Sequence, residues 1–223
     1  MVENDAAGTI RERILEAAAE EFGRAGFSGA KVDAIARRAG VNKAGLYYHL
    51  GNKEKLYEAV LLHLFGQVAG ALEQAAGEPA RSGTAFAALA GALAGLFERL
   101  PMLPRIMALE MASGGAHMPE AALVEFRRIF GVTWGILERG RVAGELIPAE
   151  PVFVHLTLVG TLVVYSLSQP LRERFAASAK DLGLDLNRPL AEAAVFLGQL
   201  LSKGLAAHPA AQPAGEADHD NDA

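Results

Sequence analysis

Hydrophobic residues recur along this chain at intervals of three and four residues, the spacing that places them on one face of an α-helix. No stretch shows the two-residue alternation of a strand, so the pattern predicts an all-α fold. The predicted helices span residues 9–23, 32–39, 43–50, about 53–76, 84–100, 105–112, 119–142, 152–168 and 189–205, with a short one at 172–180.

The most informative stretch is 31–53, KVDAIARRAGVNKAGLYYHLGNK. Gly40 follows one predicted helix at the position where a left-handed residue is favoured, because glycine has no Cβ to clash. Asn42 can cap a second helix by accepting a backbone N–H bond, and Leu46 and Leu50 give that helix an inward face. Two helices crossing at a glycine corner describe a helix-turn-helix, whose second helix can enter the major groove of DNA. The outward residues of the second helix are Lys43, Ala44, Tyr47, Tyr48 and His49.

The charge distribution also favours DNA contact at this stretch. Residues 24–55 hold seven Lys or Arg against two acidic residues, so their net charge is +5, whereas the whole chain carries −5. Affinity for DNA would therefore come from a local basic patch. A third helix begins at Asn52 and Lys53, where capped N–H groups and the lysine could hold a phosphate. The alternative is an ordinary helical hairpin with a solvated charged face.

Residues 14–60 resemble the DNA-binding domain of TetR-type transcriptional regulators. The order and spacing of the shared features hold over this region without a gap. They are Ala18 and Phe22 before Gly26-Phe27, then Ile35-Ala36, Ala39-Gly40-Val41, Leu46-Tyr47-Tyr48-His49-Leu50, Asn52-Lys53-Glu54 and Leu56-Tyr57.

The resemblance implies a role in DNA binding for specific residues. Lys43, Ala44 and Gly45 would face base edges, and Lys53 would hold a phosphate. The residues that would lie against the DNA, chiefly its backbone, are Tyr47, Tyr48 and His49, and Asn42 precedes them as the cap. One departure matters, because family members usually carry a Thr or Ser pair where this chain has Ala30-Lys31. We therefore expect that helix to lack its cap and Lys31 to supply the phosphate contact.

The helix from Lys53 is predicted to connect two domains, because its apolar stripe is wider than a lone amphipathic surface needs. We expect a three-helix DNA-binding domain at 9–55 and, by resemblance, a larger helical ligand-binding and dimerisation domain at 56–207. The polar ends at 1–8 and 208–223 are predicted to be disordered.

Residues 151–171 contain no Asp, Glu, Lys or Arg, which raises a transmembrane alternative. Polar residues within the run and the lack of a basic bias on one flank argue against it. A helix buried by its own domain on one side and by a second subunit on the other has the same composition. The last helix has the same need, with Leu190, Ala194, Leu197, Leu201 and Leu205 in register.

The helices at 152–168 and 189–205 together resemble the four-helix dimer interface of TetR-type regulators. We therefore expect a homodimer and no membrane span. A dimer also has mechanical sense, because two recognition helices related by a dyad read a palindrome with half-sites about one helical turn apart.

The chain shows no catalytic or metal-binding pattern. It has no cysteine, which fits a reducing cytoplasm, and its six histidines form no HxxxH or HExxH pair. No glycine-rich phosphate loop follows a strand. We therefore predict no enzyme, no metal and no cofactor.

The resemblance implies a cavity among the central helices for a small-molecule effector. Because few cations lie among the candidate residues, we expect an apolar or amphipathic effector rather than a polyanion. Each candidate is also compatible with ordinary core packing. The candidates are Phe97, Met102, Met107, Met111, Phe130, Trp134, Phe153 and Tyr165, with Glu110, His117 and His155 as polar groups.

The leading hypothesis is a cytoplasmic, homodimeric transcriptional regulator, usually a repressor, that binds a palindromic operator and is released by its effector through a shift in population. The alternative is a small-molecule binding or sequestering protein with degenerate DNA recognition. The Ala30-Lys31 departure gives that alternative slight support.

Overall fold

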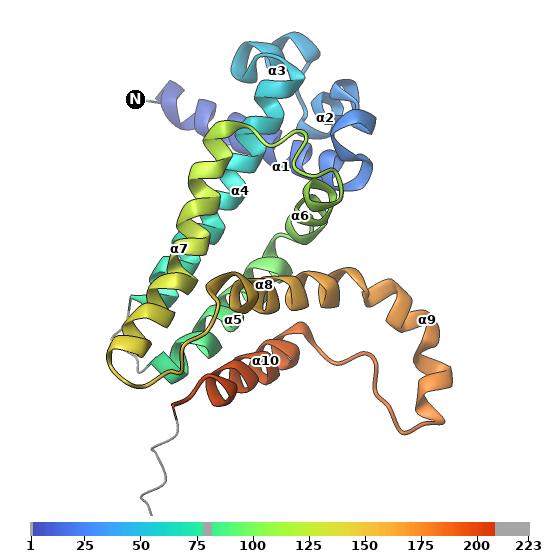
Figure 1. The fold of residues 1–223 in the computed structure, drawn as a ribbon. Helices are drawn as coiled ribbons and strands as arrows, with labels where there is room; N and C mark the ends of the chain where they lie inside the picture. The colour runs from blue at the N-terminus through green and yellow to red at the C-terminus, as the bar shows by residue number, and fades with distance from the viewer. Residues whose placement is uncertain (1, 78–81, 208–223) are drawn as a thin grey trace, which may run out of the picture.

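The computed structural model describes residues 2–77 and 82–207, and within them the chain forms ten α-helices and one isolated bridge between Leu146 and Ala206 (Figure 1). The all-α prediction is confirmed. The helices are α1 (Val2–Gly29), α2 (Val32–Ala39), α3 (Lys43–Leu50), α4 (Lys53–Ala76), α5 (Ser82–Arg99), α6 (Leu103–Ala112), α7 (Glu120–Val142), α8 (Pro151–Leu167), α9 (Gln169–Lys180) and α10 (Leu190–Gly204).

Helix α1 is longer than predicted. It begins at Val2 instead of Thr9, and its backbone includes residues that we expected to be disordered, because no proline interrupts the hydrogen bonding there. It also passes through Gly23, where a Cβ would lie 2.9 Å from Met102 Sδ, so this glycine permits close packing and does not end the helix. The predicted tail at 208–223 lies outside the described residues.

Helices α1, α2 and α3 form a compact unit at one end of the molecule, and α4 leads out of it alongside α7 (Figure 1). The core of this unit includes Phe22, Ile35 and Leu46, which are fully buried. Along α4, side chains from Leu56 to Leu72 are buried between α1, α5 and α7. The prediction that this helix is covered on more than one side is therefore confirmed.

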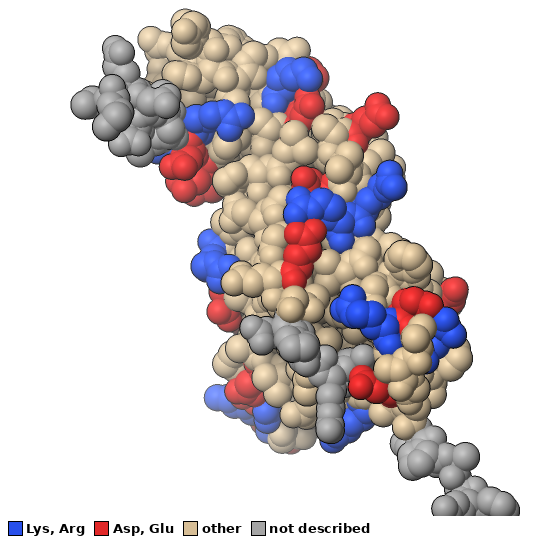
Figure 2. Space-filling model, turned by 90° about the vertical axis from the view of Figure 1, so that its left-hand side faces the viewer, with Lys and Arg blue, Asp and Glu red and all other residues tan. Residues whose placement is uncertain are grey.

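The other half of the molecule is built on the pairing of α5 with α10, with α8 packed across both. Helix α9 projects from the body, and the chain returns to α10 along its flank (Figure 1). Lys and Arg side chains alternate with Asp and Glu over the face shown in Figure 2, without a region of one sign. That face is therefore a poor candidate for DNA contact, which needs an excess of positive charge.

Gly198 allows α10 to approach α5, because a Cβ at this position would lie 2.5 Å from Ala87 Cα. We expect Gly198→Ala to lower the free energy of unfolding by about 1–3 kcal/mol through overpacking. In the control Gly91→Ala, on α5, the new Cβ meets nothing within 4 Å. That change should raise stability by about 0.5–1 kcal/mol, since alanine favours the helix. Denaturant unfolding at one protein concentration measures both, and equal effects would contradict the close approach.

Candidate nucleic-acid interface and effector cavities

The corner between α2 and α3 has the geometry that the sequence predicts. Gly40 adopts φ 69° and ψ 33°, the left-handed conformation, and the Val41 N–H donates to the Ala36 carbonyl at 3.0 Å. Asn42 Oδ1 accepts the Gly45 N–H at 2.6 Å. This bond caps α3, so the structural role of Asn42 is confirmed as a cap.

Helix α3 buries Leu46 and Leu50 and turns its other side to solvent. Tyr48 is the most exposed of its aromatic residues, with 87% of its surface accessible. His49 is half-buried beside the Tyr48 ring, with 5.4 Å between the ring centroids. The remaining predicted contact residues are exposed at Lys43, Ala44 and Tyr47 and half-buried at Gly45.

Lys43 pairs with Asp33 of α2, with 3.0 Å between Nζ and Oδ1. The hydrogen bond and the charge of Asp33 raise the pKa of Lys43, so the ammonium stays protonated at neutral pH. Both side chains are exposed, and an exposed pair contributes little stability. Lys43 can therefore leave Asp33 for a DNA group at small cost.

At the start of α2, the backbone N–H of the N-cap residue is bonded by a side chain of α1, which we did not predict. Lys31 occupies the N-cap position and makes no side-chain cap, as the Ala30-Lys31 departure predicts. Instead Glu21 of α1, which is 2% exposed, accepts the Lys31 backbone N–H at 3.2 Å. Arg24 donates to the same carboxylate at 2.9 and 3.0 Å. The Lys31 side chain is left exposed beside this cap.

Burial alone would raise the pKa of Glu21. The hydrogen bonds from Arg24 and the Lys31 amide, with the charges of Arg24 and Arg38, lower that pKa below its ordinary value of 4.5. Sequence reasoning missed Glu21, although a signal was present. Glu21 stands beside Phe22 on the helix face that also carries Ala17 and Ala18, where a carboxylate needs a partner.

The start of α4 is tied to the end of α1. Asn52 Oδ1 caps α4 by accepting the Lys55 N–H at 2.8 Å. Lys53 Nζ lies 3.3 Å from the Ser28 carbonyl oxygen and 5.0 Å from the centroid of the Phe27 ring. An ammonium group therefore sits at a capped helix N-terminus, which is where anions are favoured.

A buried hydrogen bond joins α4 to α6. The Tyr57 hydroxyl donates to Glu110 Oε1 at 2.5 Å, and Glu110 is 4% exposed. Burial, this bond and the charge of Glu110 all raise the pKa of Tyr57. Phe27 packs between Tyr57 and His117, with centroid distances of 5.1 and 4.5 Å. Glu110 and His117, predicted as polar groups of an effector cavity, thus lie at the junction of the two halves.

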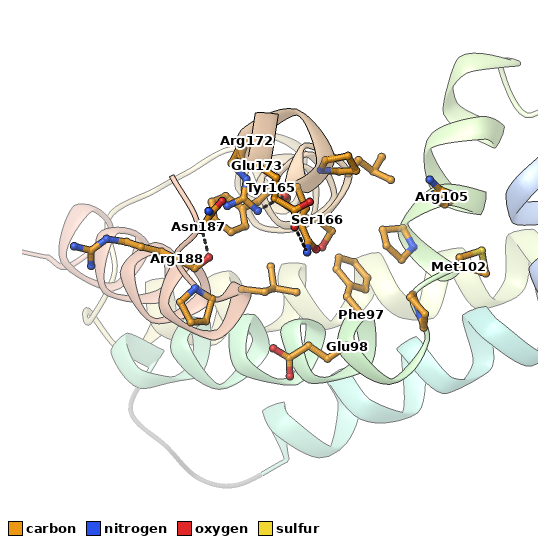
Figure 3. Close-up of a pocket in the computed structure, with 17 residues that line it drawn as sticks. Phe97, Glu98, Met102, Arg105, Tyr165, Ser166, Arg172, Glu173, Asn187 and Arg188 are labelled. Carbon is orange, nitrogen blue, oxygen red and sulfur yellow. Dashed lines mark hydrogen bonds between the residues drawn. The ribbon is translucent and has the colours of Figure 1, made fainter. Parts of the chain in front are cut away.

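A cavity of about 500 Å³ lies between the α5–α6 turn, the α8–α9 corner and the chain before α10 (Figure 3). Of the predicted cavity residues, Phe97, Met102 and Tyr165 line it. The Tyr165 hydroxyl donates to the Arg188 carbonyl at 2.7 Å, and the Arg172 guanidinium lies 3.7 Å from the centroid of the Tyr165 ring. The lining therefore combines aromatic and charged groups, and the apolar or amphipathic nature of the effector stays a prediction.

The structure does not gather the other predicted cavity residues around this space. His155 is buried on α8, where its Nδ1 lies 3.1 Å from Thr133 Oγ1 and burial lowers its pKa. Phe130 packs beside His155, at 5.3 Å between ring centroids. The other predicted residues that do not line the first cavity are Met107, which is half-buried, and Met111, Trp134 and Phe153, which are exposed.

Helices α8 and α10 share an exposed apolar surface, which we call the α8–α10 face. It comprises Phe153, Leu156 and Val164 of α8 with Val195, Phe196 and Leu200 of α10. The stripe that the sequence indicated on α10 lies elsewhere, because Ala194, Leu197 and Leu201 are buried within this chain. The stripe on α10 is therefore covered by this chain's own helices, and the homodimer interface through residues 152–168 and 189–205 stays a prediction.

In the described part of the chain, no single helix has both the length and the apolar character to cross a membrane. Two bent pairs, α5 with α6 and α8 with α9, meet those criteria only when each pair is taken together. Over the same residues, no three His, Cys, Asp or Glu side chains gather where they could hold a metal ion.

Part of this chain is similar in sequence to known proteins. Residues 14–60 match the family of bacterial regulatory proteins called the tetR family. The chain is 30% identical over 142 residues to the HTH-type transcriptional repressor NicS of Pseudomonas putida. The aligned part is 62% of this chain and 65% of NicS, so the chain spans just under two thirds of that relative. It is 47% identical over 51 residues to the HTH-type transcriptional repressor SCO4008 of Streptomyces coelicolor, covering 23% of this chain and 27% of that protein.

The fold extends beyond the matched region. The transcriptional regulator FadR of Bacillus subtilis, solved in complex with stearoyl-CoA, superposes with a TM-score of 0.69 at 19% identity. The superposition covers 87% of this chain and 98% of FadR, so the likeness includes the helices of the second half.

Glu21→Gln tests the cap supplied by α1. We expect the free energy of unfolding to fall by about 1–2 kcal/mol at pH 7, because the ionised carboxylate is lost. Since folding lowers the pKa of Glu21, its contribution is present above pH 4.5 and disappears as the pH falls through the lowered value. The difference from the wild type should therefore shrink in acid.

The control Glu20→Gln, in an exposed pair with Arg38, should change stability by less than about 0.5 kcal/mol. A difference that stays constant between pH 7 and acid would refute this assignment.

Proposed function

We propose, from the premise that this chain belongs to the TetR family of bacterial regulatory proteins, that it is a transcriptional repressor acting on a palindromic DNA operator as a homodimer. The chain is a regulatory protein and not an enzyme. The observation that carries the proposal is the exposed side of α3, where Lys43, Ala44 and Tyr48 stand on a capped helix anchored by Leu46 and Leu50.

The chemistry of this side suits a DNA duplex. A lysine and two small residues at the start of α3 permit close approach to base edges in the major groove. Two tyrosine hydroxyls and His49 follow one turn later, where backbone phosphates would lie. Lys31 and Lys53 stand at the starts of α2 and α4, so each adds a cation where a helix N-terminus already favours a phosphate.

The α8–α10 face supports the homodimer. Phe153 and Phe196 each expose 68% of their surface, and Val164 and Leu200 lie on the same helices. A contiguous exposed apolar surface of this kind is typical of a protein interface. A self-complementary contact between two copies gives a twofold axis, which a palindromic operator matches.

The effector of the proposed repressor is a small amphipathic molecule, and its binding would favour a conformer in which the two α3 helices no longer match successive major grooves. The cavity between the α5–α6 turn and the α8–α9 corner supports this part of the proposal, since it offers about 500 Å³. Because FadR was solved in complex with stearoyl-CoA, small amphipathic compounds with a single acyl chain are the ones to test first. The place of action of such a repressor is the cytoplasm.

Selection of binding sites from a randomised duplex pool, at near-physiological salt, tests the proposal directly. We expect an enriched inverted repeat whose half-sites lie about one helical turn apart. No enrichment from folded, dimeric protein, with and without candidate effectors, would reject the repressor. A protein that still bound small molecules would then be a binding or sequestering protein.

Lys43→Ala and Tyr48→Ala test the face of α3 on the selected operator. Because Tyr48 is 87% exposed, its loss should weaken operator binding without lowering the melting temperature. If Lys43 contacts a guanine, its removal should cost about 1–3 kcal/mol and relax the preference at one base pair. If it meets only a phosphate, affinity should fall uniformly across sequences and the salt slope should decrease by about 1. Lys180→Ala, on the exposed end of α9, is the control, and equal affinities in all three variants would contradict the assignment.

Phe196→Asp tests the α8–α10 face. A charge in the middle of an apolar interface has no partner, so the dimer should dissociate to monomers at micromolar concentration. The side chain is exposed in the single chain, and the monomer should therefore keep its helical content. Val142→Asp, at the exposed end of α7, is the matched control. Sedimentation velocity gives the result, and an intact Phe196→Asp dimer would place the interface elsewhere.

A further inference from the structure

A second cavity, of about 430 Å³, opens between the two halves of the chain, and we call it the interdomain cleft. Helices α1 and α2 form one side, and the turn between α5 and α6 forms the other. Its floor is apolar, with Leu64 and Leu103 buried and Met102 partly buried. Its rim is charged, with the four arginines Arg24, Arg38, Arg99 and Arg105 and the two glutamates Glu16 and Glu20.

Two of the four arginines of the cleft are ion-paired within the described residues and two are not. Arg24 is paired with Glu21 at 2.9 Å, and Arg38 is paired with Glu20 at 2.6 Å. Among the described residues, no carboxylate lies within ion-pairing distance of Arg99 or Arg105. Both are exposed at the edge of an apolar floor. The α5–α6 side of the cleft therefore presents two guanidinium groups that pair with no carboxylate in residues 2–77 and 82–207.

We propose that the interdomain cleft binds the oxyanion head of an amphipathic ligand, held by Arg99 and Arg105, with its apolar stem on Leu64, Met102 and Leu103. A guanidinium group donates two parallel N–H···O hydrogen bonds to the oxygens of a phosphate or carboxylate, and it is the preferred partner for such anions. The inference rests on the proposed function and adds the charged part of its effector.

The cleft is separate from the first cavity but adjoins it. Arg105, Met102 and Pro101 line both spaces, on either side of the α5–α6 turn. Figure 3 shows Arg105 and Met102 at the α6 end of the first cavity, away from Arg172 and Arg188. An anion at Arg105 would therefore lie at the domain boundary, where an apolar chain can reach either space.

The position of the cleft gives the ligand a mechanical effect. Arg24 and Arg38 belong to the DNA-binding half, whereas Arg99 and Arg105 belong to the other half. A ligand whose head is held by Arg99 and Arg105 lies in the space between this side and the side of α1 and α2, so its binding favours one spacing of the halves over others. A ligand shifts a conformational equilibrium by this kind of differential binding. This cluster could not be predicted from the sequence, because its arginines are far apart along the chain.

The test uses decyl phosphate, decanoate and decan-1-ol, which share one alkyl chain and differ in the head group. Calorimetric titration of the full-length protein should show binding of at least one of the two anions, at least about tenfold tighter than decan-1-ol. The double variant Arg99→Gln/Arg105→Gln should lower the affinity for that anion at least about tenfold and leave the affinity for decan-1-ol unchanged. Which anion binds identifies the head as phosphate or carboxylate.

Arg139→Gln is a matched control for Arg99→Gln. Each arginine is exposed and folds back over a glycine four residues earlier, with Nη1 3.3 Å from the Cβ position of Gly95 and 3.2 Å from that of Gly135. The control removes the same charge from the same helical setting, outside the cleft. It should bind both anions as the wild type does.

The inference is overturned if neither anion binds more tightly than decan-1-ol, or if the double variant binds them as the wild type does. Each of these results would overturn the inference both for a protein that selects an operator and for one that does not. Anion binding through Arg99 and Arg105, in a protein that selects no operator, would support the cleft and reject the repressor. Selection of an operator by a protein that binds neither anion would support the repressor and reject the cleft.

Discussion

The buried side of α4 is the surface on which both halves of the chain pack. Its side chains from Leu56 to Leu72 are buried against α1 at one end and against α5 and α7 farther along. Full burial of one such side chain contributes about 1.5–3 kcal/mol, so α4 cannot part from either half without a large loss. Because close-packed interiors do not deform continuously, a change in one half reaches the other as a movement of the whole helix.

The first turns of α4 tie that movement to α3. Gly51 ends α3 in a positive-φ conformation, and Asn52 begins α4 directly after it. Tyr57 lies on the next turn and donates the one protein hydrogen bond that the Glu110 carboxylate receives among the described residues. Separation would leave a buried carboxylate without a partner, which costs about 1–3 kcal/mol. A shift of α6 is therefore coupled to α4, and through it to α3.

Short-range signals explain why the helix-turn-helix could be predicted from the sequence. Gly40, Asn42 and Asn52 act on the backbone within a few residues of themselves, so the end of α2 and the starts of α3 and α4 follow from them. Gly23 was misread as a helix end because its role depends on Met102, far along the chain. Of the predicted cavity residues only Phe97, Met102 and Tyr165 line the first cavity, and the interdomain cleft was not predicted at all. The reason is the same, since periodicity identifies an apolar stripe but not which partner covers it. The stripe on α10 faces α5, and Phe196 on another side is left exposed.

The length of α4 decides how small a movement can matter for DNA binding. Its 24 residues span about 36 Å at about 1.5 Å each. A rotation of about 5° at one end then displaces the other by roughly 3 Å, close to the rise of about 3.4 Å per base pair. In the proposed homodimer, the two α3 helices would have to meet half-sites about 34 Å apart, so a shift of one base pair on each side would break the match. The interdomain cleft lies beside Leu64, near the middle of α4, where α1 and the α5–α6 turn flank the helix. A ligand bound there, as proposed, would tilt the helix about its middle, and the same rotation would displace each end by about half as much.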